Sequence, residues 1–271
     1  MNAKRRLDQL LVQRGLAENP SRARALVMAG AVYVAGARAG KPGNQVAANA
    51  EITVKTKEHP WASRGGLKLA HALDHFALNP SGRIALDVGA SSGGFTDVLL
   101  ARGVARVYAV DVGRAQLDWR LRRDARVVVL EGVNARFLTR AEVSEPIEFL
   151  TCDASFIGLE TVLPAPMALS APEAALVALI KPQFEVGRAN VGKGGVVRDP
   201  ALHARACERI QTWLAARPGW RVLGVVESPI TGPKGNREFL IAAVRGEAGT
   251  ALLARAPNRG HNSPGAGVRE S

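Results

Sequence analysis

The sequence has few of the features that mark secreted, metal-binding or membrane-spanning proteins. It contains two cysteines, Cys152 and Cys207, among 271 residues. Two are too few for a disulfide framework, and their spacing is not that of a zinc site. The basic N-terminus is not followed by an apolar signal core, and no apolar run approaches the length needed to cross a bilayer. These absences predict a cytoplasmic protein without a metal site, and they argue against secretion and membrane insertion.

Apolar side chains and positive charge are plentiful instead. Hydrophobic residues make up 47% of the chain, enough for one large core and a small extra domain. The formal net charge of +12 is large for this length and points to a polyanionic partner. Residues 1–60 carry ten Lys or Arg against four acids, which is half of the net charge. A solvated basic surface would also explain this excess, but we favour a nucleic-acid-binding module at the N-terminus.

The N-terminal sixty residues follow a helix-helix-strand pattern. A first helix is expected up to Gly15 and a second from Pro20 to Gly30, with short strands at 32–34 and 51–54. This arrangement resembles the S4 RNA-binding fold, in which a basic helical face lies on structured RNA. The basic residues predicted to bind RNA here are Arg5, Arg6, Arg14, Arg22, Arg24 and Lys41. One departure is Ala35, which stands where many S4 relatives carry asparagine before the glycine.

Residues 84–100 form the stretch around which the rest of the chain is organised. An apolar run ends at Val88, a glycine-rich segment covers 89–94, and helical spacing resumes at Phe95. This pattern predicts a strand, a tight loop and a helix. Glycines let the backbone approach a ligand, and the free N–H groups of a new helix bind polar atoms. The glycine spacing differs from the dinucleotide fingerprint, which disfavours NAD.

A second apolar run ends in Asp111, at the position where a carboxylate meets ribose hydroxyls in nucleotide-binding α/β units. Together with Asp87 and the loop glycines, Asp111 resembles the S-adenosylmethionine site of a Rossmann-like methyltransferase. Asn134, after the next strand-like run, is a candidate to flank the adenine. A structural turn in which Asp111 caps a helix is the alternative. The predicted cofactor-binding residues are Asp87, Gly89, Ala90, Ser91, Gly93, Gly94, Phe95, Asp111, Asn134 and Asp153.

Two later strands each end in a charged residue. Residues 147–152 lead to Asp153, and residues 176–180 lead to Lys181. Ligands of open α/β sheets gather outside the carboxyl ends of the strands, so we expect both residues to face one crevice. A structural ion pair is the alternative for these two residues. By its spacing alone, Lys68 on an amphipathic helix is more typical of a surface lysine than of a catalytic one.

The glycine-rich segment 187–200 is expected to be a basic lid near substrate phosphates, with an ordinary mobile loop as the alternative. Its Lys193, and Arg64 near the start of the larger domain, complete the residues predicted to bind RNA. Gly194 stands where a phosphate-binding loop needs a hydroxyl residue, which argues against a nucleoside triphosphatase.

Several motifs occur together in one order along nearly the whole chain. They are Arg-Leu-Asp, Pro-Trp-Ala-Ser-Arg-Gly-Gly-Leu-Lys, Asp-Val-Gly-Ala-Ser-Ser-Gly-Gly-Phe-Thr-Asp, Val-Tyr-Ala-Val-Asp-Val-Gly, Asp-Ala-Ser-Phe-Ile, Lys-Pro-Gln-Phe-Glu, Gly-Lys-Gly-Gly-Val-Val-Arg-Asp-Pro and Ser-Pro-Ile-Thr-Gly-Pro-Lys-Gly-Asn-Arg-Glu-Phe-Leu. In this combination the chain resembles the hemolysin A (TlyA) family of ribosomal RNA 2′-O-methyltransferases, in which an S4 domain precedes an FtsJ-like methyltransferase domain. The resemblance implies a catalytic tetrad formed by Lys68, Asp153, Lys181 and Glu238.

The resemblance also implies a reaction. It is the S-adenosylmethionine-dependent methylation of a ribose 2′-hydroxyl, of cytidine, in 16S and/or 23S ribosomal RNA, with rRNA or ribosomal subunits as partners. In-line transfer to a hydroxyl requires alignment and removal of a proton. We expect Lys181 to orient or deprotonate the hydroxyl and Asp153 to hold its ammonium group, while Lys68 and Glu238 complete the network. Which lysine accepts the proton stays open.

The expected fold is α/β, a Rossmann-like S-adenosylmethionine-dependent methyltransferase domain with a small N-terminal α+β S4 domain. The expected parts are an S4-like domain at 1–58, a linker at 59–63, a methyltransferase domain at 64–247 and a segment at 248–271 that is disordered at its end. Two other functions stay open: a ribosome-binding or assembly factor without catalysis, and a membrane-lytic protein, as the older family name suggests. Pseudouridine synthases also carry S4 domains, but the glycine-rich loop favours a transferase. A monomer and a homodimer are both compatible with the sequence.

Overall fold

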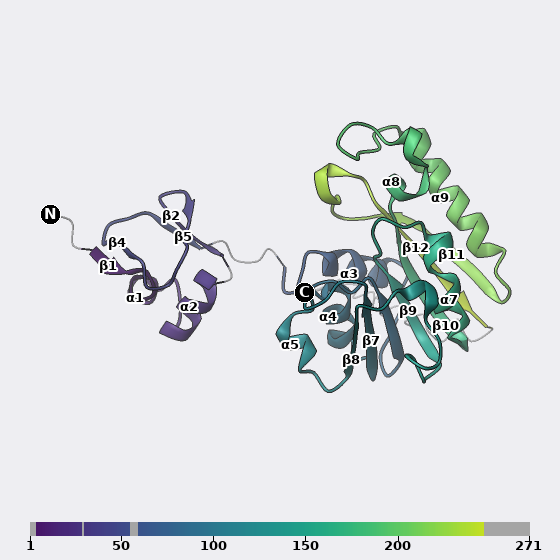
Figure 1. Ribbon diagram of the computed structural model, residues 1–271, viewed down its shortest axis with the longest axis horizontal. Coiled ribbons are helices and arrows are strands. Elements are labelled where there is room, and N and C mark those ends of the chain that lie inside the picture. Colours follow the sequence, from purple (N-terminus) through teal and green to yellow (C-terminus); the bar gives the residue numbers. More distant parts are fainter. Residues whose placement is uncertain (1–3, 29, 55–58, 247–271) are drawn as a thin grey trace, which may run out of the picture. The chain divides into compact units, whose positions relative to one another are not determined.

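The computed structural model describes residues 4–28, 30–54 and 59–246 (Figure 1). The chain divides into two compact units, Met1–Pro60 and Trp61–Ser271. The C-terminal segment 248–271, expected to be disordered at its end, lies outside the described residues, as do Lys55 and Lys57. The domain bounds given above stay a prediction.

The N-terminal unit combines two short helices with two small sheets. Its elements are β1 (Lys4–Arg6), α1 (Leu7–Gln13), α2 (Pro20–Met28), β2 (Val32–Val34), β3 (Ala37–Arg38), β4 (Gln45–Ala47) and β5 (Ile52–Val54). Strand β1 pairs with β4, and β2 lies between β3 and β5, all antiparallel. Leu7, Leu11 and Val27 are buried between the helices and the strands. The core is therefore small, and most of the unit's surface is exposed to solvent.

Two turns of this unit depend on left-handed backbone. Gly15, with φ of 68°, follows the end of α1, and the Leu16 amide donates back to the Leu11 carbonyl at 2.9 Å. Such a residue ends a helix as expected. Ala35 and Gly36 join β2 to β3 with φ of 49° and 79°. Positive φ at both central residues is the type I′ hairpin geometry, which Asn-Gly favours and which an alanine adopts with strain.

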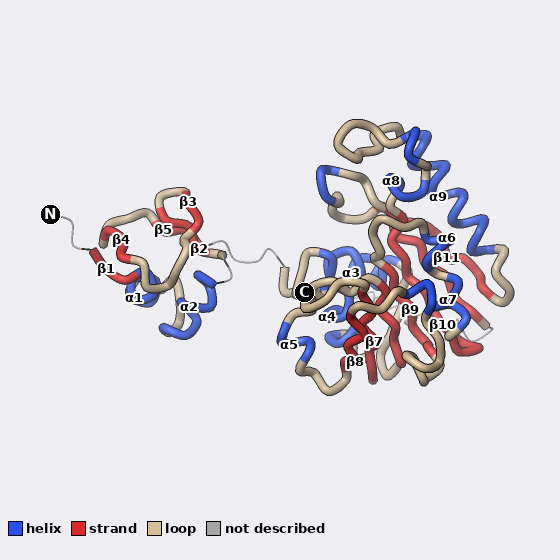
Figure 2. The backbone as a smooth tube through the Cα atoms, viewed as in Figure 1, coloured by secondary structure: helices blue, strands red, loops and turns tan. Residues whose placement is uncertain are grey.

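The C-terminal unit is built on one seven-stranded sheet covered by helices on both faces (Figure 2). The strand order is β11-β12-β10-β9-β6-β7-β8. The strands are β6 (Ile84–Val88), β7 (Arg106–Asp111), β8 (Val127–Glu131), β9 (Ile147–Cys152), β10 (Ser170–Ile180), β11 (Trp220–Glu227) and β12 (Phe239–Arg245). Strands β6 to β10 are parallel, and β12 is antiparallel to both of its neighbours. This is the expected α/β architecture.

Two hydrophobic clusters lie on opposite faces of the sheet. Helices α3 (Gly65–His75), α4 (Gly94–Ala101) and α5 (Trp119–Arg122) cover one face. The other face is covered by α6 (Leu159–Val162), α7 (Pro164–Ala168) and α9 (Pro200–Ala215), while α8 (Pro182–Glu185) follows β10. Every residue of β10 from Ala174 to Ile180 is at most 1% exposed. A central strand buried on both faces gives the continuous apolar run seen in the sequence rather than an alternating one.

The direction of the strand order changes beside β6. From β6 the chain moves outward to β7 and β8, and it then returns to place β9 on the other side of β6. Loops that leave the carboxyl ends of neighbouring strands diverge at such a switch point and leave a crevice between them. The Asp153 amide donates to the Val88 carbonyl at 2.9 Å, so the loops after β6 and β9 begin side by side. The sheet topology thus positions the site.

Trp61 and Ala62, which fall in the segment expected to be a linker, pack within the C-terminal unit. Both lie against the hydrophobic cluster to which α3 and α4 contribute. The Ala62 amide donates to Asp97 Oδ2 at 2.7 Å, and Asp97 also binds Arg120. A Cβ on Gly66 would lie 2.4 Å from Trp61 Cγ, so only glycine lets this ring pack there.

Candidate active site

Two adjoining cavities open at the carboxyl ends of the parallel strands. The first, here called the lysine cavity, has a volume of about 490 Å³ and is lined by Lys68 and Lys181. The second, the Asp111 cavity, has a volume of about 460 Å³. Both are lined by one set of shared residues: Gly89, Ser91, Asp153, Ser155 and Phe156. The two cavities are therefore parts of one larger site.

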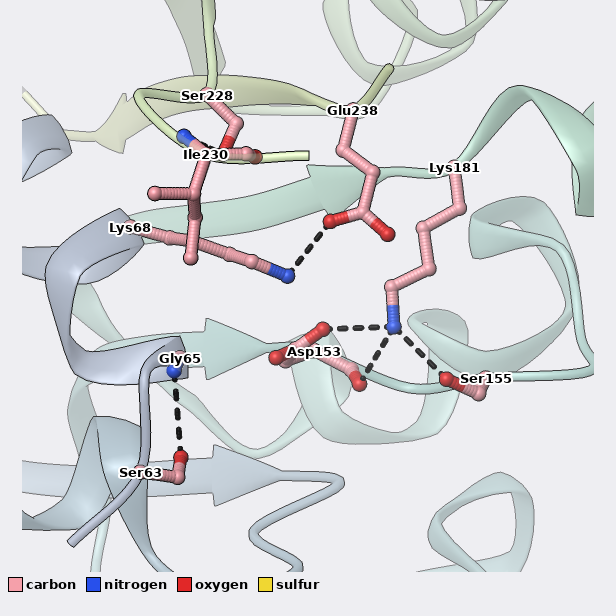
Figure 3. A network of polar contacts seen from close by, with 9 residues as sticks. All are labelled: Ser63, Gly65, Lys68, Asp153, Ser155, Lys181, Ser228, Ile230 and Glu238. Carbon is pink, nitrogen blue, oxygen red and sulfur yellow. Dashed lines mark hydrogen bonds and ion pairs between the residues drawn. The ribbon is translucent and has the colours of Figure 1, made fainter. Parts of the chain in front are cut away.

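Four charged side chains meet in the lysine cavity as two ion pairs (Figure 3). Lys68 Nζ lies 2.6 Å from Glu238 Oε2, and Lys181 Nζ lies 2.7 Å from Asp153 Oδ1. Lys181 also donates to the Asp153 carbonyl at 3.1 Å and to Ser155 Oγ at 2.8 Å. Lys181 thus makes two hydrogen bonds and is ion-paired with the Asp153 carboxylate.

The sheet register explains why these residues converge. Lys181 directly follows β10 and Glu238 directly precedes β12, and the antiparallel partners Ile180 and Phe239 place them next to each other. Asp153 follows β9, the parallel neighbour of β10. Lys68, on the first turn of α3, reaches the same edge of the sheet from above the glycine-rich loop. Residues 170 positions apart in the sequence are thereby brought into contact.

Burial makes the two pairs unusual. The side chains of Lys68 and Glu238 are 7% and 1% exposed, and those of Lys181 and Asp153 are 8% and 21% exposed. Burying charges costs free energy that a salt bridge alone rarely recovers, so stability is a weak reason for such an arrangement. Glu238 Oε1 is also buried and accepts no hydrogen bond from the residues that the structure describes. The arrangement holds two cations and two carboxylates ready at the surface of one cavity.

The Asp111 cavity contains the polar groups that the sequence pattern pointed to. Asp111 Oδ2 accepts a hydrogen bond from the Ser91 amide at 2.8 Å, and Oδ1 accepts one from the Gly113 amide at 2.7 Å. Asn134 lines the same cavity. At Gly89, with φ of 81°, a Cβ would come within 2.9 Å of the Ala154 amide nitrogen. Only glycine therefore lets the loops after β6 and β9 pass each other here.

Comparison with known protein families shows to which family the chain belongs. The sequence model of the FtsJ-like methyltransferases matches residues 61–245, and the model of the S4 domain matches residues 5–52. The chain belongs to the FtsJ-like methyltransferase family. The match confirms the resemblance on which the tetrad was predicted, and the combination with S4 is the expected one.

Relatives are similar to this FtsJ-like methyltransferase over most of their length. The 16S/23S rRNA (cytidine-2′-O)-methyltransferase TlyA of Mycobacterium tuberculosis is 48% identical over 89% of this chain and 90% of that protein. A protein of Brachyspira hyodysenteriae named Hemolysin A is 36% identical over 87% of this chain. A solved structure from Streptococcus thermophilus, named as a hemolysin, is 39% identical, covers 93% of this chain and 94% of that one, and gives a TM-score of 0.68. In the part of the chain described here, no helix is long and apolar enough to span a bilayer.

Two of the predicted cofactor-binding residues of this FtsJ-like methyltransferase line neither cavity. Asp87 is fully buried, and the hydroxyls of Thr96 and Thr151 donate to it at 2.7 and 2.9 Å. Burial raises its pKa to about 6. A Cβ on Gly93 would lie 2.2 Å from Leu121 Cδ1, so this glycine serves packing beneath the loop. Neither Asp87 nor Gly93 lines a cavity, and both residues support the packing of the glycine-rich loop.

The remaining predicted cofactor-binding residues line one cavity or both. They are Gly89, Ala90, Ser91, Gly94, Phe95, Asp111, Asn134 and Asp153.

Three residues that the sequence analysis did not assign lie at the site. Phe156 is 91% exposed, has φ of 66° and lines both cavities, and its ring lies 5.2 Å from that of Phe184. Gln183 lines the lysine cavity beside them. All three occur in the motifs Asp-Ala-Ser-Phe-Ile and Lys-Pro-Gln-Phe-Glu, which carried the family resemblance. These motifs could have pointed to the three residues, but the sequence alone did not tell which motif residues line the cavity and which do not.

Glu131 was also missed, although it follows an apolar strand in the same way as Asp111. Its carboxylate accepts hydrogen bonds from the amides of residues 115–117 and pairs with Arg122 at 2.7 Å. The Arg122 hydrogen bond and these amides lower its pKa to about 2. Glu131 therefore fixes the loop that carries Gln116, a lining residue of the Asp111 cavity.

The residues predicted to bind RNA differ in how available they are. Arg14 donates to the Ala48 and Ala50 carbonyls at 2.5 and 2.6 Å, which ties α1 to the turn before β5. Arg6 pairs with Asp8 at 2.7 Å, and Arg24 lies 3.8 Å from the same carboxylate.

The other predicted RNA-binding side chains are less constrained. Arg5 donates to Gln13 at 2.9 Å. Arg22 and Lys41 are exposed and make no side-chain hydrogen bond or ion pair with any residue in the described ranges. In the FtsJ-like unit, Arg64 is exposed and lines the lysine cavity, whereas Lys193 is exposed but does not line it.

Proposed function

We propose that this chain transfers a methyl group from S-adenosylmethionine to the 2′-hydroxyl of a cytidine in ribosomal RNA. The observation that carries the proposal is the pair of buried lysine–carboxylate contacts facing one cavity of an FtsJ-like unit. The activity for which the TlyA relatives are named supports the choice of cytidine and of rRNA. Catalysis is favoured over a binding role alone because all four tetrad residues are present and in contact.

The Asp111 cavity fits the cofactor. Its volume of about 460 Å³ lies within the usual range for small-molecule sites. Asp111 and Asn134 supply polar groups at the ends of β7 and β8, and Gly89 leaves the floor free of a side chain. S-adenosylmethionine, when bound, supplies the methyl group on a positively charged sulfur. We propose that Asp111 binds its ribose hydroxyls and that Asn134 flanks its adenine.

In the lysine cavity, we propose that Lys181 binds the ribose hydroxyl. Its ammonium group donates to the Asp153 carbonyl and to Ser155 Oγ, and it is ion-paired with the Asp153 carboxylate. An incoming 2′-hydroxyl would take the place of the exposed Ser155 hydroxyl, while Asp153 keeps the ammonium in position. Lys68 and Glu238, the second ion pair of the cavity, complete the polar network. Fixing the hydroxyl in line with the methyl donor accounts for much of the rate that such an enzyme provides.

The surface around the cavities fits an RNA strand. Trp119 and Phe137 are each 68% exposed, and the guanidinium groups of Arg123 and Arg136 lie 5.3 Å from their rings. Exposed aromatic rings and arginine planes are what unstacked RNA bases pack against. In the N-terminal unit, Arg22 and Lys41 would contact phosphates. We propose Arg64 and Lys193 as further phosphate contacts near the lysine cavity.

The test is transfer of labelled methyl from S-adenosylmethionine to purified 30S subunits, 50S subunits and protein-free rRNA. We expect label at a ribose 2′ position in at least one of them. Lys181→Ala should lower the rate by roughly 10²- to 10⁴-fold, the range typical of a lost acid–base or orienting group, while cofactor binding measured by calorimetry stays within a few-fold. A chain that binds the cofactor but labels none of the three substrates would instead support a binding or assembly factor. Full activity of Lys181→Ala would refute the assignment of Lys181.

A further inference from the structure

Gln183 carries an unused hydrogen-bonding group at the proposed active site. It lies on α8, two residues after Lys181, and lines the lysine cavity. Its Oε1 atom is buried and accepts no hydrogen bond from any residue that the structure describes. Buried polar atoms are nearly always paired in folded proteins, because an unpaired acceptor loses its hydration without compensation. An acceptor left unpaired beside a substrate cavity indicates that its partner arrives with the substrate.

The neighbours of Gln183 indicate which part of the substrate that partner belongs to. If the 2′-hydroxyl binds at Lys181, the base, which joins the adjacent ribose carbon, lies within the same cavity. Gln183 and Phe184 also line this cavity, and the Phe184 ring lies 5.2 Å from the exposed ring of Phe156. Aromatic rings offer a face on which a base stacks, and the edge of a stacked base then points sideways. Gln183, whose Oε1 atom is unpaired, offers a hydrogen-bonding group for that edge.

We propose that Gln183 reads the target base, with Oε1 accepting a hydrogen bond from the exocyclic amino group of cytosine. Uracil presents a carbonyl oxygen at the same position, with no hydrogen for Oε1, so Gln183 would have to turn its amide and present Nε2 instead. Enzymes that act on an unstacked nucleotide read it through its Watson–Crick edge in this way. The inference rests on the proposed function and adds to it a residue that selects the nucleotide.

The proposal predicts opposite results for two substitutions. Gln183→Leu removes the acceptor at similar size, whereas Gln183→Glu keeps an acceptor at the same place and cannot turn a donor toward uracil. The substrates are two unmethylated preparations of the rRNA or subunit that the wild type labels. One has cytidine at the target position and the other has uridine. We expect the wild type to prefer cytidine in kcat/KM, Gln183→Leu to reduce that preference at least tenfold, and Gln183→Glu to keep or increase it. The loss in Gln183→Leu should fall on cytidine, with uridine changed less.

The controls separate this inference from the proposed function. Cofactor affinity should be the same in both variants and the wild type, since Gln183 lines the lysine cavity and not the Asp111 cavity. Wild-type enzyme that labels no particle would refute the proposed function itself. Active wild-type enzyme with equal kcat/KM for the two nucleotides would overturn only the role of Gln183. An unchanged preference in Gln183→Leu, or an equal loss on both nucleotides, would also overturn it.

Discussion

The two units of this protein place their charged side chains in opposite ways. In the FtsJ-like unit, Lys68, Glu238 and Lys181 are nearly buried and are held in ion pairs at one cavity. In the S4 unit, Arg22 and Lys41 lie on the surface without a partner among the described residues. Stability alone explains buried charges poorly, and here they lie at a cavity, where functional sites hold such groups. Exposed cations act through the field that they share, so their exact positions matter less.

The largest expected effect tests whether the buried ion pair of Lys68 and Glu238 serves activity or only stability. Lys68→Met leaves Glu238, 1% exposed, without its partner, and removal of one member of a buried pair typically costs about 3–5 kcal/mol. The double variant Lys68→Met/Glu238→Leu removes both charges and should recover much of that loss. Methyl transfer should nevertheless stay low in the double variant. Denaturant unfolding gives the stability, and the labelling assay gives the activity.

A double variant that regains methyl transfer along with stability would show that this pair is structural. The matched control is Arg102→Met/Asp74→Leu, which removes an ion pair on the surface between α3 and α4. Surface pairs contribute little, so this control should change neither stability nor activity by much.

The buried carboxyl group of Asp87 is expected to make the free energy of unfolding depend on pH. Burial raises the pKa of Asp87 from 3.8 to about 6. The folded state therefore binds a proton that the unfolded state has lost between these values, so this group's stabilising contribution is present below pH 3.8 and is lost as the pH rises through 6. Two pKa units correspond to about 3 kcal/mol. The free energy of unfolding of the wild type, relative to Asp87→Asn, should fall by that order between pH 4 and pH 7.

The measurement is chemical denaturation of both proteins at a series of pH values. Taking the difference between the two proteins cancels the groups that they share. Glu131, whose pKa is lowered to about 2, loses its stabilising contribution only as the pH falls below about 4.5, so its effect lies mainly at lower pH. A wild-type curve parallel to that of Asp87→Asn from pH 4 to pH 7 would contradict the assignment.

The sequence predicted the site where the sheet determines it. Asp153 and Lys181 were placed correctly at one crevice because each follows a strand of a parallel sheet, and such strand ends share an edge. The side-chain environment could not be predicted in the same way. Asp87 lies inside the neighbouring strand β6, one residue before its end, and its side chain accepts hydrogen bonds from Thr96 and Thr151 and lines neither cavity. Which face of a strand a polar residue occupies depends on packing partners distant in sequence.

The arginines of the S4 unit were less predictable still. Composition identified the basic excess but could not tell that Arg14 binds two backbone carbonyls while the Arg22 side chain has no partner among the described residues. These two residues make a matched test on the exposed side of the comparison. Arg22→Ala should weaken rRNA binding and reduce the slope of log K against log salt by about 0.7 to 0.9, the value of one phosphate contact. Arg14→Ala should leave the slope closer to that of the wild type and instead lower the stability of the unit.

Filter binding over a salt series, with thermal unfolding of the same samples, measures both effects. Lys41→Ala serves as a second exposed cation and should behave like Arg22→Ala. If Arg14→Ala changed the salt slope as much as Arg22→Ala does, the contacts of Arg14 with the Ala48 and Ala50 carbonyls would not set it apart.

The smallest expected effect concerns backbone strain, which the two units also use differently. Ala35 has φ of 49° in a surface turn, whereas Phe156 has φ of 66° on the rim of both cavities. A non-glycine residue in this region costs about 1–2 kcal/mol, part of which glycine regains. Ala35→Gly should therefore stabilise the S4 unit by about 1 kcal/mol and leave methyl transfer unchanged. Phe156→Gly relieves the same strain but removes an aromatic face of the site, so it should lower methyl transfer while stability holds or rises. Full activity in Phe156→Gly would show that methyl transfer does not need this aromatic face, and loss of activity in Ala35→Gly would show that it depends on the strained turn of the S4 unit.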